Sequence, residues 1–242
     1  MKNMLFSENE KEKVYSLCFK VVETHEDRLT ENMKKVKRDF SDQLFKESIK
    51  KKINNNIDKL LINKISATAS DPIGDLLLEL LYNHNPLNKD KNYNLYQDRV
   101  KVQMQIGSLL ELYVLKKGLS NSWTIVDQII DKVDFVWIDR SDYKFFQIKN
   151  GTSTENSSSK SNRESKGIDI WKRRNPSGKK FYWNEFPDPQ LNLSEEGFME
   201  FTKYFVELQK KFIDKLIKEI GVNHASKKLN ITNKTLLQNS NN

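Results

Sequence analysis

Several residue types that carry common protein chemistry are scarce in this chain. Of its 242 residues one is cysteine and three are histidine, and His25, His84 and His224 lie far apart. An internal disulfide framework and a cysteine-based zinc site are therefore excluded, and neither a histidine-rich zinc site nor a Ser-His-Asp triad is supported. The single cysteine, Cys18, lies in an apolar-periodic segment and is predicted to be a small core residue.

Long apolar runs and glycine-rich loops are missing from the sequence as well. No segment approaches the length of a membrane-spanning helix, and the N-terminus lacks the apolar run of a signal peptide. No glycine-rich phosphate-binding loop occurs either. Together with the single cysteine, these absences lead us to expect a soluble, cytoplasmic protein.

Positive charge and aromatic side chains are what the chain has in quantity. Lys and Arg number 41 against 33 Asp and Glu, which gives a net charge of +8. Such a balance suggests an acidic partner, either nucleic acid or an anionic surface, and the alternative is charge that serves solubility alone. The 13 Phe, 8 Tyr and 4 Trp residues supply enough large side chains for a folded core.

Apolar periodicity predicts an α/β protein in three parts. The parts are a mostly helical N-terminal region at 1–97, a core at 98–220 and a polar tail at 221–242. Within the core, helices are predicted at 98–117 and 195–220, and strands at 122–128, 133–139 and 143–150. Ser7 is predicted to cap the first helix, and Gly118 to cap the end of the helix at 98–117. We therefore expect a mixed β-sheet flanked by helices.

Two neighbouring strands carry the most informative pattern, with Asp134 on the first and Gln147 and Lys149 on the second. Because side chains alternate along a strand, Gln147 and Lys149 share one face. A two-residue loop between the strands sets Asp134 opposite Gln147, and a four-residue loop sets it opposite Lys149. A three-residue loop puts Asp134 on the other face, and the sequence alone leaves this choice open.

These residue types suit metal-assisted hydrolysis of a phosphodiester. Mg²⁺ needs hard oxygen ligands, which Asp134, the Gln147 side chain and the backbone carbonyl of Ile148 can supply. Lys149 would orient or acidify the attacking water and offset charge on the phosphate. Glu111, in the helix before the first strand, is a candidate second carboxylate. The alternative is a plain salt bridge between Asp134 and Lys149, because so short a motif often occurs by chance.

The positive charge is concentrated directly behind this motif. Residues 144–180 hold ten basic and three acidic side chains, a net charge of +7, with aromatic residues interleaved. Lys and Arg contact phosphates, and Arg and Asn also read base edges in the major groove. We therefore predict DNA recognition by residues 150–190, and the alternative is a flexible, solvated linker at 151–167. The candidate DNA-contacting residues are Asn150, Asn156, Ser157, Ser158, Ser159, Lys160, Ser161, Arg163, Lys166, Lys172, Arg173, Arg174 and Lys179.

Several short segments of this stretch form a recognisable pattern. They are Gln147-Ile148-Lys149-Asn150, Thr154-Glu155-Asn156-Ser157-Ser158-Ser159, Arg163, Ile170-Trp171 and Trp183-Asn184. In these segments the chain resembles the type II restriction endonucleases of the SinI kind, and more broadly the PD-(D/E)XK nuclease superfamily. The resemblance covers residues 100–190 or so. In addition, Gln105-Ile106-Gly107-Ser108-Leu109-Leu110-Glu111 is similar to the helix that precedes the family's catalytic strands.

The resemblance implies a restriction-endonuclease-like fold and a homodimer that cuts double-stranded DNA with Mg²⁺ at a short palindromic site. It implies a GC-rich target of the GGWCC or GGNCC type, and a cognate DNA methyltransferase as the genetic partner. Asp134, Gln147 and Lys149 are implied as catalytic residues, with Glu111 as a candidate, and residues 150–183 as the base-reading region.

The sequence departs from the superfamily's usual pattern at two positions. Val133 stands where Pro is common before the Asp, and Gln147 stands where Asp or Glu is common, which weakens one metal ligand. Two other functions therefore remain open. One is a repair or junction-resolving nuclease of the same superfamily, and the other is a DNA-binding protein without catalysis.

Overall fold

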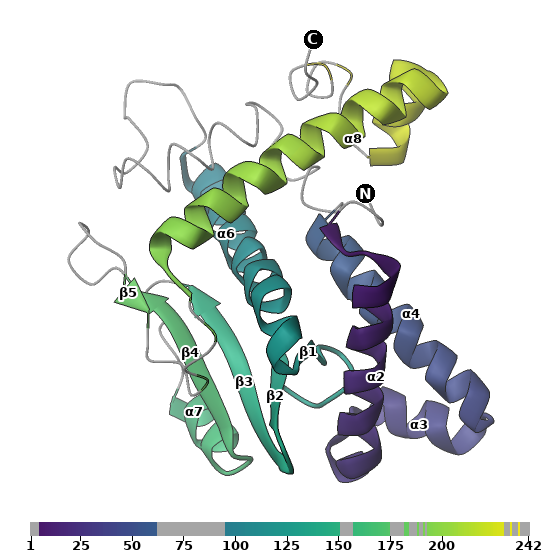
Figure 1. The fold of residues 1–242 in the computed structure, drawn as a ribbon, viewed down its shortest axis with the longest axis vertical. Helices are drawn as coiled ribbons and strands as arrows, with labels where there is room; N and C mark the ends of the chain where they lie inside the picture. Colours follow the sequence, from purple (N-terminus) through teal and green to yellow (C-terminus); the bar gives the residue numbers. More distant parts are fainter. Residues whose placement is uncertain are drawn as a thin grey trace.

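The computed structural model describes most of the chain, with helices packed around one mixed sheet (Figure 1). The described residues are 5–61, 95–150, 157–174, 182, 183, 188, 191, 193–229, 233 and 237. Their helices are α2 (Glu8–Thr24), η1 (Glu26–Arg28), α3 (Glu31–Asp39), α4 (Asp42–Leu61), α6 (Leu95–Gly118), η3 (Leu119–Asn121), α7 (Ser157–Glu164) and α8 (Glu195–Leu229). Their strands are β1 (Trp123–Ile125), β2 (Phe135–Asp139), β3 (Asp142–Asn150), β4 (Ile168–Arg174) and β5 (Tyr182–Trp183).

The strands form a five-stranded sheet in the order β1-β2-β3-β4-β5. All neighbouring pairs are antiparallel except β3 and β4, which run parallel and are connected through α7. The predicted α/β class, with a mixed sheet, flanking helices and a helical N-terminal region, is confirmed for the described residues. Residues 62–94 of the predicted N-terminal region lie outside them. No helix in the described ranges is both long and apolar enough to cross a membrane.

The two faces of the sheet have different coverings because side chains alternate along each strand. Trp123, Phe146 and Trp171 project from one face and are buried. Trp123 stacks on Phe146 with ring centroids 5.1 Å apart. The α6 and α8 helices cover this side and pack together through aromatic rings, with Tyr113 5.5 Å from Phe198. The opposite face of β1 meets α2.

The N-terminal helices pack beside the sheet, with α2 against β1 and with α4 against both α2 and α6 (Figure 1). Ser7 caps α2 as predicted, since its hydroxyl accepts from the Glu10 backbone N–H at 3.2 Å while the Glu10 side chain accepts from the Ser7 N–H. Cys18 is fully buried in the core, also as predicted. On β1, the Thr124 hydroxyl donates to the carbonyl of Val14, which ties α2 to the sheet.

Gly118 ends α6 for a different reason from the predicted one. Its φ of −82° is right-handed, so it is not the left-handed cap that glycine usually provides. A Cβ at this position would lie 2.6 Å from the Trp123 Cβ. The absent side chain therefore makes room for Trp123 to pack under the end of the helix.

The segment predicted to read DNA contains three described elements that the sequence analysis did not predict, α7, β4 and β5. The dense Ser, Asn, Lys and Arg content hid the alternation of Ile168 and Ile170 on β4. Arg173, near the end of this strand, is 0% exposed and lies over the Phe198 ring of α8. Its Nε donates to Glu195 Oε2 at 3.0 Å, and its Nη2 donates to Glu195 Oε1. This burial contradicts the predicted DNA contact of Arg173, whose role here is to tie β4 to α8.

The Arg173–Glu195 pair yields a stability prediction. Glu195→Ala leaves the guanidinium buried without its carboxylate, which should lower the free energy of unfolding by about 3–5 kcal/mol. Thermal unfolding followed by circular dichroism measures this loss. Glu196→Ala, at an exposed neighbouring position, is the control and should change little. The double variant Arg173→Met/Glu195→Gln removes the charge altogether and should lose less than Glu195→Ala; a larger loss would contradict the argument.

Candidate functional site

The turn between β2 and β3 decides which residues share a face. Asp139 pairs with Asp142, so the loop is the two-residue Arg140-Ser141 connection. Arg140 takes a left-handed conformation with φ 55°, which allows the chain to reverse within two residues. Continuing the register places Asp134 opposite Gln147, one of the two arrangements that keep Asp134, Gln147 and Lys149 on one face.

Asp134 lies where β2 and β3 stop pairing, immediately before Phe135, which opens β2 opposite Phe146. Its backbone N–H donates to the Phe146 carbonyl at 2.9 Å, and its carbonyl accepts from the Val126 N–H at 3.0 Å. Two residues after Phe146 on β3, the Ile148 N–H has the Asp134 side chain as its hydrogen-bond acceptor in place of a backbone carbonyl, with Oδ2 at 3.0 Å. The carboxylate is thereby fixed against the strand that carries Gln147 and Lys149.

Lys149 faces this carboxylate, with Nζ 3.6 Å from Asp134 Oδ2. The Asp134 side chain is 19% exposed and that of Lys149 is 37% exposed. The salt bridge offered by the alternative interpretation is therefore present. It also leaves the ammonium at the open side of the pair, where an anionic substrate could approach it.

The pKa of the Asp134 carboxyl is raised above its usual value. Burial is the largest cause, and the nearby carboxylate of Asp127 acts in the same direction. Lys149 and the Ile148 N–H oppose the shift by stabilising the charged form. The site thus holds a carboxylate that lacks enough positive charge and hydration to be as acidic as an ordinary Asp. Such imbalance is common where a protein binds a cation or a substrate.

Gln147 uses its amide to hold the chain that leads to Asp134. Its Nε2 donates to the carbonyl of Lys132 at 2.7 Å. Lys132 itself has a left-handed φ of 63°, so this part of the chain adopts a constrained turn. With the nitrogen engaged, the side-chain oxygen of Gln147 is the atom left to serve as a ligand.

The donor set fits a single Mg²⁺ that completes its coordination with water and substrate. Within the described residues no cluster of three or more His, Cys, Asp or Glu side chains could hold a metal by itself. In a strand the N–H and C=O of one residue point to the same side. Because the Ile148 N–H meets Asp134, the Ile148 carbonyl is directed to that side too. One carboxylate with neutral oxygens suits Mg²⁺, which usually keeps several waters and binds substrate phosphates.

The predicted DNA-contacting residues fall into different environments. Lys172 pairs in register with Lys149 across the parallel strands, so it lies on the same face of the sheet as Lys149. Lys160 and Ser161 are exposed on α7, while Arg163 is only 7% exposed. Lys166 forms an ion pair with Asp131 at 2.6 Å. Asn156 and Lys179, and the side chains of Asn150, Ser157, Ser158, Ser159 and Arg174, lie outside the described residues.

Glu111 lies half-buried in α6, and its part in the site remains a prediction. The sequence analysis missed other residues that the structure brings to the site. Asp127, Asp131 and Lys132 belong to the loop before Asp134 and touch or perturb the predicted residues. Their spacing from Asp134 was visible in the sequence, but their loop conformation was not.

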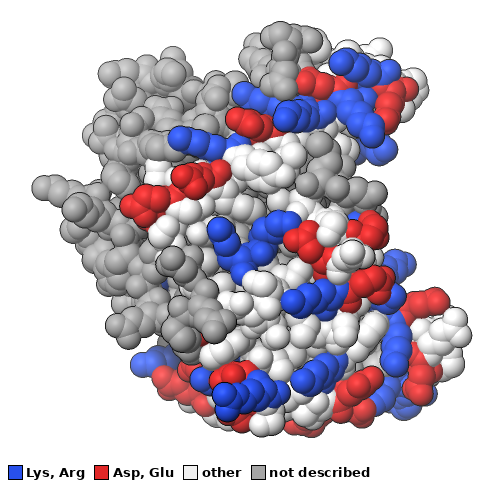
Figure 2. Space-filling view, viewed as in Figure 1, with Lys and Arg blue, Asp and Glu red and all other residues white. Residues whose placement is uncertain are grey.

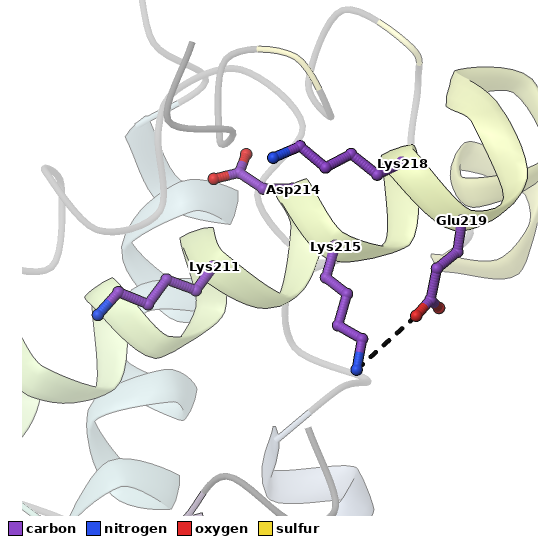
Figure 3. A pocket seen from close by; sticks show the side chains of 5 residues that line it. All are labelled: Lys211, Asp214, Lys215, Lys218 and Glu219. Atoms are coloured by element: carbon purple, nitrogen blue, oxygen red, sulfur yellow. Dashed lines mark ion pairs between the residues drawn. The ribbon is translucent and has the colours of Figure 1, made fainter.

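Other charged surfaces offer weaker candidates. In Figure 2 the described side chains of both signs alternate on the visible face, without a continuous basic area. A hollow of about 400 Å³ on α8 is lined by Lys211, Asp214, Lys215, Lys218 and Glu219 (Figure 3). Its Lys215–Glu219 pair, at 3.7 Å, is an ordinary contact between successive helical turns. Nothing in this hollow matches the predicted chemistry.

Comparisons with known proteins find similarity to restriction endonucleases. The sequence model of the SinI restriction endonuclease family matches residues 9–208. The type II restriction enzyme Eco47I of Escherichia coli is 28% identical over 144 residues, covering 57% of this chain and 63% of that protein. The type II restriction enzyme SinI of Salmonella infantis is 27% identical over 148 residues, covering 57% of this chain and 64% of that protein. The matches thus span less than two thirds of either relative.

The raised pKa of Asp134 predicts a pH-dependent gain in stability for Asp134→Asn. The folded state binds the proton more tightly than the unfolded state, so the charged carboxylate destabilises the fold at pH values above its folded pKa. The isosteric amide removes this cost and can still accept from the Ile148 N–H. The melting temperature of the variant should exceed that of the wild type at pH 7.5, at about 2–4 °C per kcal/mol gained.

The gain should shrink as the pH falls through the folded pKa, because the wild-type carboxyl then becomes neutral too. Glu47→Gln, an exposed substitution on α4, serves as the matched control and should change the melting temperature little at any pH. An Asp134→Asn variant that is less stable than the wild type at pH 7.5 would rule out this account of the site.

Proposed function

The chain belongs to the SinI restriction endonuclease family, and we propose that it is a type II restriction endonuclease. The proposed reaction is Mg²⁺-dependent hydrolysis of phosphodiester bonds in double-stranded DNA at a short palindromic site. The observation that carries the proposal is that Asp134, Gln147 and Lys149 lie on one face of the sheet, where β2 and β3 stop pairing. Hydrogen bonds hold Asp134 and Gln147 there, and Lys149 pairs with Asp134. Two relatives with names of type II restriction enzymes support it.

In this proposal Asp134, the Gln147 side-chain oxygen and the Ile148 carbonyl hold Mg²⁺, with Glu111 as a candidate second carboxylate. When bound, such an ion polarises the phosphate and lowers the pKa of water. Asp134 contributes the negative charge, and its burial keeps competing water away from the carboxylate. Its hydrogen bond from Ile148 prevents the side chain from rotating out of place.

Lys149 is proposed to contact the phosphate of the DNA. Its Nζ is paired with Asp134 in the structure, and a phosphate oxygen next to the carboxylate would come within reach of the same ammonium. The ammonium would stabilise negative charge that builds on the phosphate and orient the attacking water. Lys172, aligned with Lys149 on β4, adds positive charge to the same face and would hold the DNA backbone nearby.

The remaining parts of the proposal concern DNA and partners. Residues 150–190 would read the bases, with α7 as the described element best exposed for contact. A homodimer would match the two-fold symmetry of a palindrome. We propose a GC-rich target of the GGWCC or GGNCC type, a cognate DNA methyltransferase and a cytoplasmic location, and we retain 1–97, 98–220 and 221–242 as the proposed division of the chain.

A cleavage assay tests the proposal. The wild type with Mg²⁺ should cut unmodified phage DNA into discrete bands, and chelation of the metal should stop the reaction. Lys149→Ala should lower kcat by about 10²–10³, as the loss of a charge-stabilising group does. Asp134→Ala should abolish detectable cleavage, while Glu47→Gln should cut like the wild type.

Other outcomes would indicate a rival function or refute the proposed catalytic residues. Cutting confined to mismatched or branched substrates would indicate a repair or junction-resolving nuclease. Specific DNA binding with no cleavage by the wild type would indicate a binding protein without catalysis. Cleavage that is equal in the wild type, Asp134→Ala and Lys149→Ala would refute the catalytic assignment.

Gln147 gives a separate prediction about the metal. Gln147→Glu adds a second carboxylate, and because ligand charge raises affinity for hard cations, the Mg²⁺ concentration for half-maximal cleavage should fall. The same substitution loses the hydrogen bond to the Lys132 carbonyl, so the melting temperature should fall as well. Gln147→Leu is the comparison variant, since it loses the hydrogen bond without gaining charge. An equal Mg²⁺ requirement in both variants would remove Gln147 from the proposed ligands.

A further inference from the structure

The loop at residues 127–133, which leads into Asp134, is held by the N-terminal helices through its backbone. The Asp131 N–H donates to the Arg28 carbonyl at 2.9 Å, and the Thr30 N–H donates to the Ile129 carbonyl at 2.9 Å. Leu29 and Ile130 form an isolated antiparallel bridge between them. The loop is therefore paired with the end of η1 and the residues that follow it by antiparallel backbone hydrogen bonds, like those between two short strands.

The same loop is held from its other side by the turn between α7 and β4. Lys166 Nζ lies 2.6 Å from Asp131 Oδ2, and this contact holds the pKa of Asp131 below its usual value. Arg28 Nη2 donates to the Lys166 carbonyl at 2.7 Å while its guanidinium lies 4.0 Å from the centre of the Phe145 ring. Three segments that are distant in sequence thus meet at Asp131.

The contact lies only a few residues from the proposed catalytic groups. Asp131 immediately precedes Lys132, whose carbonyl accepts a hydrogen bond from Gln147. Asp134 lies two residues after Lys132. On the other side, Lys166 lies in the short turn between α7 and β4, the strand that carries Lys172. A shift of the α7–β4 turn would therefore act on the loop that positions both Gln147 and Asp134.

We propose that Asp131 and Lys166 are positioning residues that connect the DNA-reading segment to the catalytic loop. In this inference, which rests on the proposed function, DNA bound along α7 fixes the turn, and the ion pair transmits that position to Asp134. Lys166 then acts through Asp131 rather than as one more phosphate contact. Cleavage, more than DNA affinity, depends on the pair.

The exposure of the pair favours a positioning role over a stabilising one. The side chains of Lys166 and Asp131 are 42% and 43% exposed, and exposed ion pairs contribute little to folding stability. They line a cavity of about 370 Å³ together with Asp27, Arg28 and Lys34, so the side chains have room to change their contacts. Breaking the pair should therefore leave a folded protein whose catalysis can be measured.

The test is a double-mutant cycle with Asp131→Asn, Lys166→Met and both together. Single-turnover cleavage at saturating DNA gives the rate of the chemical step, and equilibrium binding without Mg²⁺ gives the Kd for cognate DNA and for sites with one wrong base pair. Each single variant should cleave about 10-fold more slowly. The double variant should lose little more than either one, because both changes remove the same link. The cognate Kd should stay near that of the wild type for Asp131→Asn.

The charge-exchanged variant Asp131→Lys/Lys166→Asp restores an ion pair and should recover part of the lost rate. Lys46→Met, which breaks the exposed contact between Lys46 and Glu23 at 3.8 Å, is the matched control and should cleave at the wild-type rate. A direct phosphate contact by Lys166 predicts something else. Lys166→Met would then weaken DNA binding and reduce the salt dependence of log Kd by a slope of about 1, and Asp131→Asn would bind DNA more tightly.

That result would overturn the inference, and so would variants that melt earlier but cleave at the wild-type rate when folded. These outcomes differ from a failure of the proposed function itself. If the wild type does not cut DNA at specific sites, the proposed function fails before the pair is tested. If the wild type cuts and the cycle shows independent, additive losses, only the coupling is refuted.

Discussion

The site depends on a single constraint, the two-residue reversal of the chain at Arg140-Ser141. Because the side-chain period of a strand is two, one residue more or less in this turn would send Asp134 to the face covered by α6 and α8. The pairs on either side resist such a slip. Phe135, Phe146 and Ile148 are buried on the same face, and a shift of β3 by one residue would exchange Phe146 and Ile148 for Gln147 and Lys149 in the apolar layer. The apolar pairing thus fixes the position of the polar one.

The hydrogen bonds of the site also show what the amide of Gln147 does there. Gln147 donates from Nε2 to the Lys132 carbonyl, which a carboxylate could not do, and so it closes the turn that delivers Asp134. As a result, Asp134 is the one carboxylate among the three residues of the site. Burial raises the pKa of that carboxyl, and Lys149 and the Ile148 N–H offset only part of this cost. An acid at position 147 would add negative charge to the site and would lose the hydrogen bond that supports the turn.

The sequence predicts those parts of this arrangement that are encoded locally. Strand composition predicts the hairpin, Ser7 predicts the start of α2, and the phenylalanines predict α8 as far as residue 220, although the helix ends at Leu229. Arg173 shows where local reasoning fails. A basic residue in a basic stretch reads as a phosphate contact, but its partner Glu195 is 22 residues away on another element, and strand parity turns it toward α8. The parallel pairing of β3 with β4 is likewise non-local, so the placement of Lys172 beside Lys149 could be recognised only in three dimensions.

The order of the residues in the sequence also hides the contact between the N-terminal region and the loop before Asp134. Arg28 and Asp131 are separated by α3, α4 and α6 in sequence, yet their backbones are hydrogen-bonded. The sheet is thereby braced from two directions. The α6 and α8 helices pack on its apolar face, and η1 holds the loop that leads to Asp134 on its other face. A loop anchored only by its ends could not keep a half-buried carboxylate in place against its own desolvation, since a small rotation toward water would relieve it. The contacts of Asp131 and Gln147 oppose that rotation, which makes the N-terminal region part of the geometry of the site.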